Sequence, residues 1–120
     1  MKYILKTREG LYLEHTYVKG VHTWSLNPHK LYAGLYSQSS AYRLRRRFVN
    51  CRIYKTMTGY VLYTMVDGYR KYVTHFSIIE DGPNILTQVA LDSRVYRITD
   101  HKYAKDLAKK LRCIIQEVAI

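Results

Sequence analysis

The sequence predicts an α+β fold, an antiparallel β-sheet with two short amphipathic helices, and three observations support this prediction. Asp67-Gly68 lies between two β-rich arms, and Asp-Gly in such a setting indicates a hairpin because both central residues of a type I′ turn need positive φ. Residues 3–14 repeat this pattern around Glu9-Gly10. Two later segments carry apolar residues at helical spacing, each directly after a residue type that caps helices.

The chain divides into two similar halves. Tyr3-Ile-Leu matches Tyr60-Val-Leu, and the hairpin, the cap and the helix follow in the same order in each half. A repeat of about 60 residues is longer than a single solenoid unit, which favours two half-domains over an open array. The sequence therefore predicts one domain, 1–120, built from tandem hairpin–strand–helix–strand half-repeats, 1–57 and 58–120, that share one core.

In the first half, the hairpin is followed by a turn at Gly20 and a short strand at Val21–Leu26. Residues 30–36 alternate enough to form a brief strand or an extended lead-in. Ser37 is expected to cap a helix. The apolar stripe of that helix consists of Ala41, Leu44 and Phe48. Cys51–Thr56 then reads as a strand.

The second half repeats this order after its hairpin. Four features precede its helix: a turn at Asp81-Gly-Pro-Asn84, a strand at Ile85–Leu91, a turn at Asp92-Ser93 and a strand at Val95–Ile98. Asp100 is expected to cap the second helix. One face of this helix carries Ala104, Leu107, Ala108 and Leu111. Residues 113–120 form either a last strand or an extension of the helix.

Two features of the composition bear on partners. Lys and Arg total 20 against 9 for Asp and Glu, which gives a net charge of +11 at pH 7, and there are 13 tyrosines but only 2 phenylalanines. A basic surface with interspersed tyrosines suits an anionic partner, either nucleic acid or an acidic protein surface. Tyr and Arg are also favoured contact residues in protein interfaces.

The candidate partner-binding site is the arginine-rich first helix. Guanidinium groups bind phosphate and carboxylate bidentately, and four arginines in five residues repel one another, which is an unusual choice for solubility alone. Arg43, Arg46 and Arg47 are expected to point away from the apolar stripe, with Arg45 flanking it. The predicted site consists of Tyr42, Arg43, Arg45, Arg46, Arg47 and Arg52, and a secondary basic face of Lys102, Lys105 and Lys109.

The tyrosines of the second hairpin allow two interpretations. They could stack on nucleic-acid bases, as on sheet platforms that bind single strands. They could instead form cross-strand aromatic pairs that stabilise the sheet. We favour the structural interpretation, because no RNP-type signature accompanies them. The residues concerned are Tyr60, Tyr63, Tyr69 and Tyr72.

Catalytic and metal-binding motifs are not found in the sequence. The 5 histidines show neither HExxH nor Cys/His zinc spacing, and GxSxG, P-loop and GxGxxG patterns are missing. Cys51 would be a nucleophile only if a histidine approached it, and a buried apolar cysteine is commoner. We therefore expect a non-enzymatic protein without metal or cofactor. The chain shows no signal peptide and no segment of transmembrane length, so a reduced, cytoplasmic setting without membrane attachment is expected.

The order of motifs resembles a style found in small bacteriophage and prophage proteins. It consists of Tyr3-Ile-Leu-Lys-Thr-Arg-Glu-Gly-Leu-Tyr-Leu13, a Trp-containing strand, a short Ala-x-x-Leu helix and a closing strand, doubled over nearly the whole chain. The resemblance implies an accessory protein in the bacterial host cytoplasm. Anti-defence proteins, which bind and block a host immune effector, are the kind it most suggests.

Two functional hypotheses follow. In the first, the chain binds and inhibits or regulates a host protein that has an acidic surface, and an anti-phage defence effector is the favoured target. In the second, it is a nucleic-acid-binding module in which the arginine helix contacts phosphates and tyrosines stack on bases. Salt separates them, because nucleic-acid binding falls steeply with salt, whereas a packed protein interface survives it. A weaker third hypothesis is a self-associating phage structural subunit.

Overall fold

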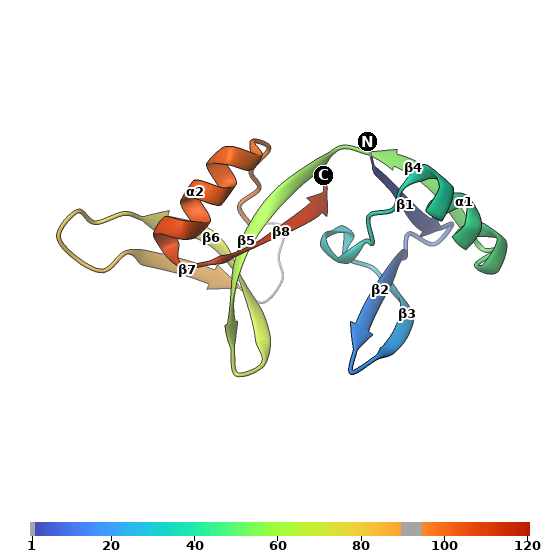
Figure 1. Ribbon diagram of the computed structural model, residues 1–120, viewed down its shortest axis with the longest axis horizontal. Helices are drawn as coiled ribbons and strands as arrows, with labels where there is room; N and C mark the ends of the chain where they lie inside the picture. The colour runs from blue at the N-terminus through green and yellow to red at the C-terminus, as the bar shows by residue number, and fades with distance from the viewer. Residues whose placement is uncertain (1, 90–94) are drawn as a thin grey trace. The chain divides into compact units, whose positions relative to one another are not determined.

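The computed structural model describes residues 2–89 and 95–120 and contains two antiparallel four-stranded sheets and two α-helices, which confirms the α+β class (Figure 1). The first sheet has the strand order β3-β2-β1-β4 and the second has the order β7-β6-β5-β8. Both sheets therefore have the same topology: a three-stranded meander, then a helix, then a strand that returns beside the first.

The chain falls into two compact units, which are described separately. The first runs up to Thr58 and includes the last three residues, Val118–Ile120; the second is Gly59–Glu117. The first unit contains β1 (Lys2–Thr7), β2 (Tyr12–Val18), β3 (Val21–Asn27), the 3₁₀ turn η1 (Lys30–Tyr32), α1 (Gln38–Arg47) and β4 (Cys51–Thr56). The other elements are β5 (Thr58–Val66), β6 (Tyr69–Ser77), β7 (Ile85–Val89), α2 (His101–Leu111) and β8 (Ile114–Ala119).

The hairpins form where the turn residues allow positive φ. Asp67 and Gly68 have φ of 51° and 81°, so the predicted type I′ turn between β5 and β6 is confirmed. Gly10, in the turn between β1 and β2, has φ of 89°, which confirms the first hairpin. Lys19 and Gly20, with φ of 51° and 80°, form a further two-residue turn that joins β2 to β3.

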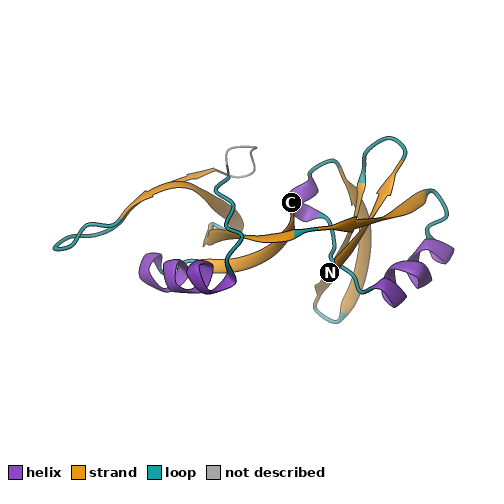
Figure 2. Ribbon diagram, turned by 90° about the horizontal axis from the view of Figure 1, so that it is seen from above, coloured by secondary structure: helices purple, strands orange, loops and turns teal. Residues whose placement is uncertain are grey.

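The helices begin at the predicted caps. The Ser37 hydroxyl accepts from the Ser40 amide at 3.3 Å, and the Asp100 carboxylate accepts from the amides of Lys102 and Tyr103 at 2.9 and 3.4 Å. These bonds satisfy donors that the first turn of a helix leaves open. Each helix lies alongside the strands of its own unit (Figure 2).

Each unit has a hydrophobic cluster at its helix. In the first, the predicted stripe of Ala41, Leu44 and Phe48 packs with Leu5, Leu13 and Cys51. In the second, the buried members are Leu62, Val73, Ile98, Ala104, Leu107, Ala108 and Leu111, which confirms the predicted apolar face. Each of these clusters lies within one unit, and the core that we expected both halves to share stays a prediction.

The structure differs from the sequence prediction at several segments. Residues 95–98 do not form a strand: Tyr96 donates to the Val73 carbonyl of β6 and Ile98 bridges Tyr60 of β5, so the segment crosses from one strand to another instead of pairing along one. Residues 30–32 form a 3₁₀ turn, and Tyr36 bridges Tyr3. The strand expected at Ile85–Leu91 ends at Val89, and the predicted turn at Asp92-Ser93 lies outside the described residues. The last segment, left open by the sequence, is the strand β8.

Candidate functional site

The β2–β3 hairpin of the first unit carries a row of stacked rings. Because Lys19-Gly20 is a two-residue turn, His15 lies directly opposite Trp24 and Tyr17 lies opposite His22. The His15 and Trp24 rings stack at 4.3 Å, and the His15 and His22 rings stack at 4.9 Å. His15 Nε2 and His22 Nδ1 are 2.8 Å apart and share a hydrogen bond. We call Tyr17, His22, His15 and Trp24 the aromatic stack.

The aromatic stack ends against α1 at Trp24. The Trp24 ring lies 5.4 Å from that of Phe48, at the C-terminal end of α1, and the Arg47 guanidinium lies 5.9 Å from the Trp24 ring centre. The same guanidinium lies 5.4 Å from the ring of Phe48. A guanidinium within about 6 Å of an aromatic face is attracted by the ring quadrupole. These contacts hold Arg47 at a fixed place on the surface.

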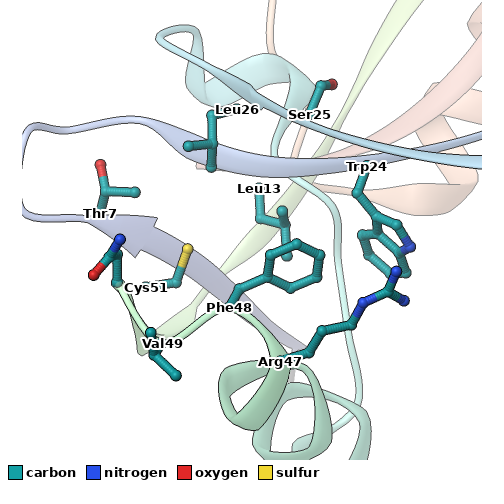
Figure 3. Close-up of a pocket in the computed structure, with 10 residues that line it drawn as sticks. Thr7, Leu13, Trp24, Ser25, Leu26, Arg47, Phe48, Val49 and Cys51 are labelled. Carbon is teal, nitrogen blue, oxygen red and sulfur yellow. The ribbon is translucent and has the colours of Figure 1, made fainter.

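A pocket of about 280 Å³ opens beside these contacts (Figure 3). The Phe48 ring points toward Leu13 at its centre, and the Arg47 guanidinium lies next to the Trp24 indole at one end. Its lining consists of Thr7, Leu13, Trp24, Ser25, Leu26, Arg47, Phe48, Val49, Asn50 and Cys51. We call it the Phe48 pocket. Leu26 and Val49 are 47% and 77% exposed, so its mouth presents apolar surface next to a cation.

A second hollow also borders Trp24. It has a volume of about 500 Å³ and is lined by His15, Trp24, Tyr36, Ser40, Arg43, Leu44 and Arg47. The Arg43 guanidinium donates to the Ser40 hydroxyl at 3.2 Å. We call this the Ser40 hollow. Trp24 and Arg47 thus line both hollows, and the described residues that line them include no Asp or Glu.

Tyr36, in the lining of the Ser40 hollow, has a buried hydroxyl. It is the one buried side-chain oxygen or nitrogen without a hydrogen-bond partner in the described part of the chain. The ring lies close over Gly34, where a Cβ would collide with it. Burial, followed by the charges of Glu14 and Cys51, raises the pKa of Tyr36 to about 12. The hydroxyl therefore remains protonated near neutral pH.

The predicted arginines divide between the two flanks of α1. The buried stripe of the helix has Arg43 and Arg47 on one side, toward Trp24, and Tyr42 and Arg45 on the other. The other flank borders a hollow of about 420 Å³, which we call the Arg45 hollow. Its lining consists of Tyr3, Tyr42, Arg45, Arg52, Ile53 and Lys55. Arg46 is exposed and lines none of these three hollows.

The expected orientation of Arg47 is wrong. Helical spacing alone directs it away from the stripe, but the long side chain folds back over Phe48, a member of that stripe, and over Trp24. Attraction between the guanidinium and the two rings accounts for this. The secondary basic face keeps its predicted place on α2, where Lys102, Lys105 and Lys109 are all exposed.

The tyrosines of the second hairpin pair mainly with neighbours. Tyr72 is completely buried and lies directly opposite Tyr63, with ring centres 5.8 Å apart. The Arg70 guanidinium covers the Tyr63 ring at 4.6 Å, and Tyr60 stacks on His101 at 4.8 Å. Tyr69 is 73% exposed. These contacts favour cross-strand stabilisation, the interpretation that we preferred from the sequence.

Candidate metal ligands do not cluster in the part of the chain that the structure describes. No group of three or more His, Cys, Asp or Glu side chains there could hold a metal ion. Burial raises the pKa of the Cys51 thiol, which disfavours the reactive thiolate. Within residues 2–89 and 95–120, no helix is long and apolar enough to cross a bilayer.

Comparison with known proteins gives no match among family models, curated proteins or solved structures. The function must therefore be inferred from the geometry of the site.

Sequence reasoning missed the aromatic stack, although a signal for it was present. The sequence predicts a turn at Gly20 and a Trp-containing strand after it, but the pairing of that strand with residues 12–18 was not worked out from the turn. A two-residue turn at Lys19-Gly20 fixes the register of the two strands, so the residue that faces each position can be worked out from the sequence. This register places His15 opposite Trp24.

Proposed function

We propose that the chain is a non-enzymatic binding protein that attaches to an acidic surface of a host protein and inhibits or regulates it. The observation that most supports this is the position of Arg47, held over Trp24 at the mouth of the apolar Phe48 pocket (Figure 3). An aromatic ring and an arginine beside a pocket form the usual centre of a protein interface. An acidic residue next to an apolar one on the partner would match this arrangement.

The charge of the first unit supports the same partner. Arg43 and Arg47 lie on one flank of α1, and within residues 2–89 and 95–120 no acidic side chain lines the two hollows beside them. Such a field speeds the approach of an acidic surface and disfavours basic ones. By its small size and motif order, the chain resembles phage accessory proteins, so a defence effector in the bacterial cytoplasm is the target that we propose.

The test is a pull-down from bacterial lysate with tagged protein, with and without nuclease, washed at about 0.3 M salt to screen surface attraction. We expect one stoichiometric protein band that survives nuclease. The variant Arg43→Glu/Arg47→Glu should lose this band, whereas Lys102→Glu/Lys105→Glu, with the same change of charge on α2, should retain it. Equal retention by both variants, with folding checked by circular dichroism, would reject the site.

A specific observation favours nucleic-acid binding as the second candidate. The aromatic stack ends at Tyr17, which is 62% exposed, and bases stack readily on such rings. In this case, affinity for a single-stranded oligonucleotide should fall with salt, with a logarithmic slope of about 0.7 per phosphate contacted. Tyr17→Ala should weaken it, while the nuclease-treated pull-down should contain no protein partner.

A further inference from the structure

The Arg45 hollow gathers three cationic side chains from two elements. Tyr42 and Arg45, three residues apart, share one flank of α1. Lys55 comes from β4, with Tyr3 of β1 directly opposite it in the sheet. Arg52 also comes from β4, which is an edge strand of the first sheet. The packing of Cys51 and Ile53 against α1 keeps these two elements together.

These cations lie without a neighbouring acidic residue among the residues that the structure describes. The described residues that line the hollow include no Asp or Glu. Within residues 2–89 and 95–120, no ion pair or side-chain hydrogen bond engages Arg45, Arg52 or Lys55. Three positive charges around one hollow repel one another, and the attraction of each to an anion bound there would offset that repulsion. The hollow therefore has the electrostatics of an anion site.

The donors suit phosphate better than carboxylate. The guanidinium and ammonium groups of the residues lining the hollow supply enough donors and charge for the two charges and three terminal oxygens of a phosphomonoester dianion. A carboxylate has one charge and two oxygens, so it would leave part of the cationic lining unmatched. The volume of about 420 Å³ lies within the range of roughly 300–1,000 Å³ for small-molecule sites. Tyr3 and Tyr42 add rings that a nucleobase can contact.

We infer that the Arg45 hollow binds a phosphomonoester dianion, with room for a group the size of a nucleoside. The residues that line it differ from those of the Phe48 pocket and the Ser40 hollow. The inference therefore does not rest on the proposed function, and each can fail without the other.

The test is titration of the whole protein with inorganic phosphate, adenosine 5′-monophosphate and adenosine at about 0.15 M salt, followed by calorimetry and by NMR. Both phosphates should bind, and adenosine should not. Arg45→Gln should weaken nucleotide binding at least about tenfold, because it removes charge-assisted hydrogen bonds. Arg46→Gln is the matched control: it removes the same charge from the next residue, which lines none of the three hollows described above, and should change affinity less than about twofold.

Other results would overturn the inference. Absence of phosphate binding, adenosine binding as tight as that of the nucleotide, or equal losses in the two variants would each do so. Changes in NMR chemical shift that are confined to Arg43 and Arg47 would place the anion at the Ser40 hollow instead. If Arg45→Gln fails to fold, Arg52→Gln on β4 provides the same test from the other wall of the hollow.

Discussion

The two units have the same strand order but differ in what their helices and hairpins carry. Counted from the caps Ser37 and Asp100, Arg43 of α1 corresponds to Asp106 of α2, and Arg45 corresponds to Ala108. In the first unit, His15 faces Trp24, whereas in the second unit His75 faces Thr87. Each of these histidines comes two residues after a buried residue of the middle strand of its meander.

This difference separates the requirements of the fold from those of binding. Both helices keep a cap and an apolar stripe, so these features build the unit. The arginines of α1, the tryptophan and the hollows around them are not needed for that topology, because the second unit folds without them. We therefore expect binding residues to concentrate in the first unit, and stability to depend on equivalent positions in both.

The largest effect should come from the helix core. Leu107 of α2 is 3% exposed, whereas its counterpart Leu44 is only partly buried and lines the Ser40 hollow. Leu107→Ala should lower the free energy of unfolding by about 2–5 kcal/mol, and Leu44→Ala by roughly 1–2 kcal/mol, since less contact is lost. Urea denaturation measures both. Equal losses would mean that the two helices are anchored alike.

The next effect concerns Gly34, whose space is occupied by the Tyr36 ring. A Cβ at position 34 would overlap the hydroxyl and the adjoining ring carbons. Gly34→Ala should therefore destabilise the protein by about 1–3 kcal/mol. In the second unit, Ile98 makes the bridge that corresponds to that of Tyr36. The same substitution in a Tyr36→Ile background should lose less stability, and an undiminished loss would show that the ring is not the cause.

The caps should differ by a smaller amount. Asp100 accepts from two amides, with a shortest distance of 2.9 Å, whereas Ser37 accepts from one amide at 3.3 Å. Asp100→Ala should lower stability by about 1–2 kcal/mol and Ser37→Ala by about 0.5–1 kcal/mol. Thermal unfolding followed by circular dichroism would show which cap contributes more stability. A larger loss at Ser37 would contradict the prediction that Asp100 is the stronger cap.

The smallest effect should come from Tyr36→Phe. Its hydroxyl is buried without a partner, so its removal should be neutral or stabilise the protein by up to about 1 kcal/mol. The raised pKa, about 12, means that the folded state holds the proton more tightly than the unfolded chain. The stability that the folded state gains from holding this proton is complete below pH 10 and is lost as the pH rises toward 12. Stability should therefore decline less steeply in the variant over that range, and an unchanged slope would reject the burial of the phenol.

Much of the scaffold was predictable because its signals are local. Asp67-Gly68, Ser37 and Asp100 act within a few residues of themselves, and each occupies its expected place. The stripe ending at Phe48 was predictable for the same reason, since helical spacing alone brings its members together.

The candidate site was only partly predictable, because its geometry depends on contacts distant in sequence. The arginines could be found by counting, but their division between two flanks depends on where α1 lies against the sheet. The path of Arg47 depends on Trp24, which reaches it through the pairing of β2 with β3. Tyr3 and Lys55 line the Arg45 hollow but were not predicted to do so, because their proximity depends on the register between β1 and β4.

That register has a consequence for how such a chain can grow. Lys2 lies directly opposite Thr56, so the point where the chain enters the first sheet and the point where it leaves are on adjacent strands, about 5 Å apart. Only Met57 separates β4 from β5. A segment whose two ends adjoin can be copied in tandem without a long connecting peptide, and in this chain the last three residues, Val118–Ile120, then complete the first unit.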